Sequence, residues 1–118
     1  MPTYSLVVPA YNEEGVIREL AARITEVMDA LDGDAEAILV DDGSRDRTYE
    51  LMVAAAQEEP RLRLIRLSRN FGHQIALTAG VDLAAGDAVI VLDADLQDPP
   101  EVILELGQWA RAGGRCRL

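Results

Sequence analysis

Short apolar runs alternate along the chain with stretches in which apolar side chains recur every three or four residues. We predict β-strands over the runs 5–8, 37–40, 62–67 and 88–92. We predict helices over 16–31, 47–57 and 74–85, and a last helix that begins at 99–101. Strands that alternate with helices are typical of βαβ units, so the sequence predicts an α/β fold with a mostly parallel sheet. We expect Pro9 to end the first strand.

Polar residues follow directly after three of the predicted strands, in the segments 9–14, 41–44 and 93–97. In an open α/β sheet, ligands bind outside the carboxyl ends of the strands, at the point where the strand order reverses. With the usual order 3-2-1-4, the first strand lies between the second and the fourth. We therefore expect these three segments to share one crevice.

Two carboxylates in the last of these segments suggest a metal site. Asp93 and Asp95 lie on the same side of an extended segment, because side chains alternate along it. Such a pair suits Mg²⁺ or Mn²⁺, which bind one or two protein carboxylates together with substrate phosphate oxygens. Gln97 can add a carbonyl oxygen or orient a bound water. Taken alone, the same residues also fit a solvated turn with acidic helix-capping residues.

The other polar candidates each allow a structural and a functional interpretation. Asp41 and Asp42 form either an ordinary turn with the following Gly-Ser or a pair of acceptors for a base or a ribose. Tyr11 either stacks on a ring or packs beside the end of the strand. Asn12 and Glu13, taken in isolation, fit plain helix-capping residues.

His73 is the one histidine of the chain. Without Cys or His neighbours it makes a poor metal ligand. It lies where the third helix begins, so it can cap that helix or line the crevice. A role as catalytic base stays open.

Composition narrows the class of function. The chain has 118 residues and forms one domain at most, and its 49% hydrophobic and 27% charged residues fit a soluble globular protein. The formal charge of −10 argues against nucleic acid as a partner, because phosphate contacts need basic patches. All 11 basic residues are Arg, which excludes phosphate sites that depend on a lysine. No apolar run approaches the roughly 20 residues of a membrane span. Cys116 has no second cysteine with which to form a disulfide within the chain, so nothing indicates an oxidising compartment. We therefore expect a cytoplasmic protein.

Four segments, taken together, resemble a known family. They read LVVPAYNEE, VDDGSRDRT, LSRNFGHQIALTAGVDLAAGD and IVLDADLQDPPE. They resemble the N-terminal half of family 2 glycosyltransferases, which have the Rossmann-like GT-A fold with helices on both faces of the sheet. They are most similar to the branch of dolichol-phosphate mannosyltransferase and bacterial polyprenyl-phosphate glycosyltransferases. The resemblance covers residues 4–106, so we predict that residues 1–118 form one partial GT-A domain, the half that binds the sugar nucleotide.

The resemblance implies a metal-dependent, inverting enzyme with Mg²⁺ or Mn²⁺ as cofactor. Such an enzyme moves a sugar from GDP-mannose or a UDP-sugar to the phosphate of a polyprenyl carrier, at the cytoplasmic face of the membrane. Contacts to the nucleotide-sugar are implied at Pro9, Tyr11, Glu13, Val40, Asp42, Asp93, Ala94 and Asp95. Metal ligands are implied at Asp93, Asp95 and Gln97, the catalytic residues are Asp95 and Asp93, and Asp98 is a supporting residue. The acceptor phosphate is itself an anionic nucleophile, which fits the lack of a convincing base.

The end of the chain departs from the family pattern. The family carries its acceptor-phosphate arginines and the rest of its sheet beyond this half, and the segment 113–118, GGRCRL, does not resemble the expected next strand. We therefore expect donor and metal binding without efficient transfer. We also expect an exposed edge of the fourth strand, which favours a dimer or a larger homo-oligomer.

Two other classes of protein remain as alternatives. A phosphoacceptor receiver would place its acidic pair after the first strand and a lysine late in the chain, whereas here the pair follows the second strand and lysine is absent. The second alternative is a non-catalytic module that binds a nucleotide-sugar or a partner chain. It differs from the enzyme in turnover alone.

Overall fold

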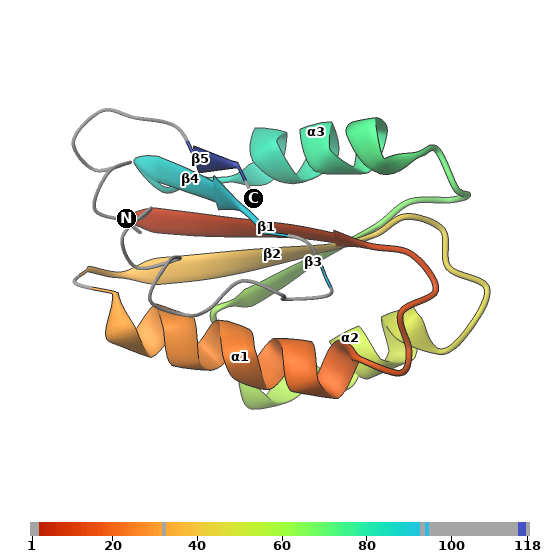
Figure 1. The fold of residues 1–118 in the computed structure, drawn as a ribbon, viewed down its shortest axis with the longest axis horizontal. Coiled ribbons are helices and arrows are strands. Elements are labelled where there is room, and N and C mark those ends of the chain that lie inside the picture. Colours follow the sequence, from red (N-terminus) through yellow and green to blue (C-terminus); the bar gives the residue numbers. More distant parts are fainter. Residues whose placement is uncertain (1–2, 32, 93, 95–115, 118) are drawn as a thin grey trace.

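A parallel sheet with helices on both faces forms the core of the chain. The computed structural model describes residues 3–31, 33–92, 94 and 116–117. The strands are β1 (Tyr4–Ala10), β2 (Ala35–Asp41), β3 (Leu62–Arg66), β4 (Ala88–Val91) and β5 (Cys116–Arg117), in the order β3-β2-β1-β4-β5. The helices are α1 (Ile17–Ala30), α2 (Thr48–Glu58) and α3 (His73–Leu83). Figure 1 shows α1 and α2 on one face of the sheet and α3 on the other. The predicted α/β class and the strand order 3-2-1-4 are confirmed.

The two central strands are buried along their whole length, because helices cover both of their faces. Every residue of β1 and β2 is buried, as is typical of parallel strands. Alternate side chains serve two separate cores. Leu6, Val8 and Leu39 belong to the core under α1 and α2, whereas Val7 and Ile38 belong to the core under α3.

The first strand is longer than predicted, and the expectation that Pro9 ends it is wrong. β1 continues through Pro9 to Ala10, and Pro9 pairs in register with Val40 of β2. The carbonyl of Val7 faces β4, where it accepts a hydrogen bond from Leu92 N. Residues two apart on a strand direct their backbone groups to the same side, so the nitrogen of Pro9, which carries no hydrogen, also faces the β4 side. The β1–β4 pairing ends at Val7, so no ladder hydrogen bond is lost at Pro9.

The expectation that the segment 113–118 contributes no strand is also wrong. Cys116 and Arg117 pair in parallel with Ile90 and Val91 of β4. A short strand can pair along the open edge of a sheet through its backbone groups alone, without a pattern of apolar side chains. The residue types of this segment therefore do not indicate the strand. β5 covers part of the β4 edge, and the predicted oligomer stays a prediction. The helix predicted from 99–101 onward lies outside the described residues.

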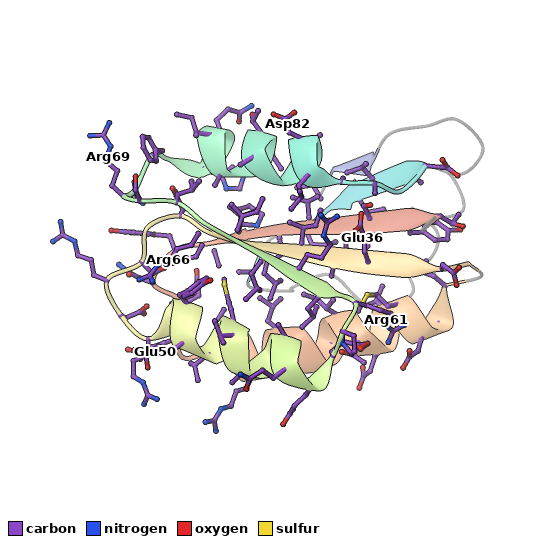
Figure 2. All side chains as sticks on the ribbon, turned by 180° about the vertical axis from the view of Figure 1, so that it is seen from behind. Glu36, Glu50, Arg61, Arg66, Arg69 and Asp82 are labelled. Carbon is purple, nitrogen blue, oxygen red and sulfur yellow. The ribbon has the colours of Figure 1, made fainter. Side chains whose placement is uncertain are left out.

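A hydrogen-bond network joins three strands near the amino ends of the sheet. Glu36 Oε2 accepts from Ser5 Oγ at 2.5 Å and from Ala85 N at 2.7 Å, and Glu36 Oε1 accepts from Arg63 Nη1 at 2.9 Å. Gly86 N donates to Ser5 Oγ at 2.8 Å. Burial raises the pKa of Glu36, but the hydrogen bonds from Ser5, Ala85 and Arg63 outweigh it and hold that pKa below its usual value. The network fixes the α3–β4 connection to the sheet, and Figure 2 labels Glu36 within it.

Helix α3 packs closely on the sheet through Gly80. A Cβ atom at this position would lie 2.4 Å from Val7 Cγ1 and 3.0 Å from Val40 Cγ2. Both valines are fully buried and stiff at χ1, so they cannot move aside cheaply.

Gly80→Ala is therefore expected to lower the free energy of unfolding by about 1 kcal/mol. The added methyl group overpacks the core, and this cost exceeds the gain in helix propensity that alanine brings. Urea denaturation measures it, with Gly15→Ala as the control because no atom lies within 4 Å of a Cβ at Gly15. A stabilised Gly80→Ala protein would contradict the close packing.

Among the described residues, no helix is both long and apolar enough to cross a membrane.

Candidate functional site

A pocket of about 390 Å³ lies at the carboxyl ends of the strands. Its lining residues are Pro9, Ala10, Tyr11, Glu13, Asp42, Asn70, Gly72, His73 and Ala94. They come from the end of β1, from the residue after β2, from the start of α3 and from the segment after β4. The structure thus brings together the three loops that strand topology placed in one crevice.

Most of the predicted nucleotide contacts line this pocket. Pro9, Tyr11, Glu13, Asp42 and Ala94 are among its walls. Tyr11 is 40% exposed, so its ring is accessible to a ligand.

Val40 is the one predicted site residue in the described part of the chain that is not among the residues lining the pocket. Val40 is fully buried in the core under α3, so its predicted nucleotide contact stays a prediction. Asp93, Asp95 and Gln97 lie outside the described residues.

Hydrogen bonds join the loop after β1 to the loop after β2. Asn12 N donates to Ser44 Oγ, and Arg45 N donates to Asn12 Oδ1, each at 2.9 Å. Asn12 has φ 53°, a left-handed conformation that asparagine tolerates better than most residues. Asn12 therefore connects two loops and does not cap α1, in which Val16 is the N-cap residue.

The same two loops meet again at the start of α2. Glu13 N donates to Thr48 Oγ1 at 2.8 Å, and Glu14 N donates to Asp46 Oδ2 at 3.3 Å. Asp46 Oδ1 accepts from Thr48 N at 2.9 Å. Burial raises the pKa of Asp46, but hydrogen bonds from Thr48 and Glu14 together outweigh it and hold that pKa below its usual value. These contacts hold the backbone at Glu13 in place beside the pocket.

The two adjacent aspartates at the end of β2 have different surroundings. Asp42 lines the pocket and is 4% exposed. Asp41 is fully buried, its Oδ1 accepts from Ser44 N at 3.0 Å, and its Oδ2 has no hydrogen-bond partner in the described part of the chain. Arg66 Nε lies 3.7 Å from that oxygen, and the Arg66 guanidinium stacks on the ring of Tyr49. The structure therefore does not present Asp41 and Asp42 as one acceptor pair.

The electrostatics of the pocket favour a cation. Glu13 and Asp42 bring carboxylates to its wall, and none of its described lining residues is an arginine. Within the described residues, no group of three or more His, Cys, Asp and Glu side chains is placed to hold a metal. An anionic ligand would therefore need a cation bound with the help of residues beyond this lining.

A larger pocket of about 750 Å³ lies elsewhere, between α1 and α2. Its walls include Ala21, Ala22, Ala54 and Ala55, with Arg18 as the cation among its described residues. It lies beside helix surfaces and away from the carboxyl ends of the strands. We assign the site to the smaller pocket, because its described lining brings polar groups together from several loops, whereas the larger pocket is lined mainly by two helices.

One wall of the pocket contains residues that the sequence did not predict there. Asn70 and Gly72 line the pocket together with His73, although they follow β3, the strand furthest from β4 in the predicted order. The chain must cross from β3 over the sheet to reach β4, and this crossing brings the start of α3 beside the ends of β1 and β2. The segment NFGH, two residues after the predicted strand 62–67, was the signal that could have indicated this wall.

Comparisons with known proteins agree with this geometry. Residues 5–115 match the family described as glycosyl transferase family 2. The chain is 55% identical over 103 residues to the uncharacterized glycosyltransferase YkcC of Bacillus subtilis, covering 87% of this chain and 32% of that protein. It is 47% identical over 110 residues to the undecaprenyl-phosphate 4-deoxy-4-formamido-L-arabinose transferase of Aeromonas hydrophila, covering 92% of this chain and 34% of the relative. The chain thus spans about a third of the length of these relatives.

A solved structure has the same fold in this region. The mannosyltransferase PcManGT from Pyrobaculum calidifontis, in complex with GDP-Man and Mn²⁺, superimposes with a TM-score of 0.78 at 28% sequence identity. The match covers 92% of this chain and 32% of that chain. The resemblance to GT-A glycosyltransferases is confirmed. Since the family match runs through residues 5–115, this chain belongs to glycosyl transferase family 2.

Proposed function

We propose that the pocket at the carboxyl ends of the strands binds a nucleotide-sugar, GDP-mannose or a UDP-sugar, together with Mg²⁺ or Mn²⁺. One observation carries the proposal: Tyr11, Asp42 and Ala94 meet in this pocket from three separate loops. Ala94 is 8% exposed and is bonded covalently to Asp93 and Asp95. For this reason we assign the metal to the wall that Ala94 forms.

The described residues offer suitable contacts for a nucleoside. The exposed ring of Tyr11 can stack on a base. Asp42 accepts three hydrogen bonds from residues that the structure describes, and a carboxylate has about four acceptor sites. One site therefore remains for an N–H of the base or a hydroxyl of the ribose.

The residues of the chain fit a hard divalent cation. Carboxylate oxygens of Asp93 and Asp95 and the amide oxygen of Gln97 are ligands that Mg²⁺ and Mn²⁺ accept. The pocket wall already carries Glu13 and Asp42 and no described arginine, so a diphosphate needs a cation to bind there. When bound, the metal would stabilise the negative charge that develops on the departing nucleoside diphosphate. The PcManGT structure, which is a complex with both GDP-Man and Mn²⁺, supports this assignment.

For the whole enzyme, we propose inverting transfer of the sugar to the phosphate of a polyprenyl carrier. The Aeromonas relative, an undecaprenyl-phosphate transferase, supports this class of acceptor. An acceptor phosphate is already an anionic nucleophile, so the reaction requires no strong base. His73 lines the pocket but is not assigned that role.

Calorimetric titration of GDP-mannose and UDP-glucose into the 118-residue chain, with and without Mn²⁺, tests the proposal. We expect binding only when Mn²⁺ is present, and the preferred nucleotide identifies the base. A folded protein that binds neither nucleotide-sugar would contradict the proposal.

Turnover is tested separately, because the chain spans about a third of its relatives. We expect no efficient transfer to polyprenyl phosphate by this chain. Robust transfer by the purified chain would overturn that expectation and leave the proposed binding site in place.

A further inference from the structure

Asp42 is bound to the segment that precedes α3. Its Oδ1 accepts from Phe71 N at 2.9 Å, and its Oδ2 accepts from Gly72 N at 3.2 Å and from Asn70 Nδ2 at 3.4 Å. The side chain is almost wholly buried, so water competes little for these hydrogen bonds. The end of β2 therefore holds the backbone at the start of α3.

Gly43 brings the same two segments into direct backbone contact. A Cβ atom at Gly43 would lie 2.1 Å from the carbonyl carbon of Arg69, 2.6 Å from its carbonyl oxygen and 2.4 Å from Asn70 N. These are backbone atoms and cannot rotate away. Gly43 also has φ 73°, a conformation that side chains disfavour. Both the space and the conformation at position 43 therefore require glycine.

The segment held in this way forms one wall of the pocket. Asn70, Gly72 and His73 line the pocket, whereas Gly43 does not. We propose that Asp42, Gly43 and residues 69–72, which we call the β2–α3 clamp, position this wall for the nucleotide. Gly43 is then a positioning residue, because it acts on the ligand only through the segment against which it packs.

The clamp also gives Asp42 a second role. The family resemblance implies that Asp42 contacts the nucleotide, but most of its acceptor capacity is used within the protein. Loss of its carboxylate would displace Asn70 and His73 as well as remove a ligand contact. The identity of the ligand rests on the proposed function, whereas the geometry of the clamp does not.

Amide hydrogen exchange, measured by NMR on the ligand-free 118-residue chain, tests the clamp itself. In the wild type, we expect slow exchange of the Phe71 and Gly72 amides, because a buried carboxylate accepts from both. In Asp42→Asn, we expect both amides to exchange roughly tenfold faster or more, because the amide group has one acceptor oxygen and a donating NH₂. The amide of Leu39 in β2 is the internal reference and is expected to keep its rate. Unchanged rates at Phe71 and Gly72 would overturn the clamp.

Nucleotide affinity tests what the clamp does. We expect Gly43→Ala to weaken the binding of GDP in the presence of Mn²⁺ by roughly tenfold or more, because a displaced wall loses at least one hydrogen bond to the nucleotide, and the loss of one such bond changes affinity by about tenfold. Gly15→Ala is the matched control, since its methyl group meets no atom within 4 Å, and its affinity is expected to equal that of the wild type. Wild-type affinity in a folded Gly43→Ala protein would overturn the positioning role.

The two measurements separate this inference from the proposed function. If the wild type does not bind GDP, the proposed function fails, and the exchange rates in Asp42→Asn still decide whether the clamp exists. If Gly43→Ala does not fold, the exchange rates of the Phe71 and Gly72 amides in Asp42→Asn still decide whether the clamp exists. Fast exchange in the wild type contradicts the clamp whatever nucleotide binds.

Discussion

Asp95→Ala is expected to abolish the Mn²⁺-dependent binding of a nucleotide-sugar, with a loss in affinity of about 100-fold or more. The expected sign is informative, because the chain has a net charge of −10. If Asp95 bound no metal, its removal would reduce repulsion and strengthen the binding of an anionic nucleotide. A strong loss of affinity therefore requires that the carboxylate acts through a cation. Calorimetric titration with and without Mn²⁺ measures the effect.

Asp82→Ala is the matched control for this substitution. Asp82 is exposed on α3, at the end far from Arg69, as Figure 2 shows. The substitution removes the same charge without approaching the pocket, so the affinity is expected to stay within about twofold of the wild type. Equal losses in the two variants, or tighter binding by Asp95→Ala, would contradict a metal site at Asp95.

Glu36→Ala is expected to lower the free energy of unfolding by about 2–3 kcal/mol, because the substitution leaves the Ser5 hydroxyl and the Ala85 N–H without their acceptor. The Arg63 side chain is 40% exposed and keeps its hydration, so its ion pair adds little. Urea denaturation at neutral pH measures the loss. Glu26→Ala, at an exposed position of α1, is the control and is expected to change stability by less than about 0.5 kcal/mol.

The pH dependence of stability tests the same network. The pKa of Glu36 is lower in the folded protein than in the unfolded chain. The carboxylate therefore stabilises the fold above its unfolded pKa, and this contribution is lost as the pH falls through the folded pKa. The difference in stability between the wild type and Glu36→Ala is expected to shrink on acidification from pH 7. A constant difference would show that the charge of Glu36 does not contribute.

The pattern of apolar positions predicted the strands, the helices and their order well, because burial determines where apolar side chains recur along the chain. The short apolar runs 5–8 and 37–40 indicated two strands, and both β1 and β2 are fully buried. The boundaries depended on backbone pairing, which composition does not reveal. Pro9 remains in β1 because the neighbouring strand has ended, and β5 exists because β4 offers a free edge.

The site was predictable where it follows from strand order. Parallel strands in the order 3-2-1-4 bring Tyr11, Asp42 and Ala94 together at the carboxyl ends of the strands, and all three line the pocket. The wall formed by Asn70 and Gly72 was not predictable in this way, because it depends on tertiary hydrogen bonds to Asp42. The sequence also did not show that Glu36 belongs to a buried network, since its partners come from distant segments.

Line broadening by Mn²⁺ in the NMR spectrum of the 118-residue chain, recorded in the presence of GDP, shows directly whether the metal binds at the carboxyl ends of the strands. The paramagnetic ion broadens signals of nuclei near it, so it locates the metal without any assay of turnover. We expect selective loss of the amide signals of Tyr11, Asp42 and Ala94, while Ala21 and Ala54 in the pocket between α1 and α2 keep theirs. Broadening centred on Ala21 and Ala54, or no selective broadening in a folded protein, would contradict a metal-dependent nucleotide site at the carboxyl ends of the strands.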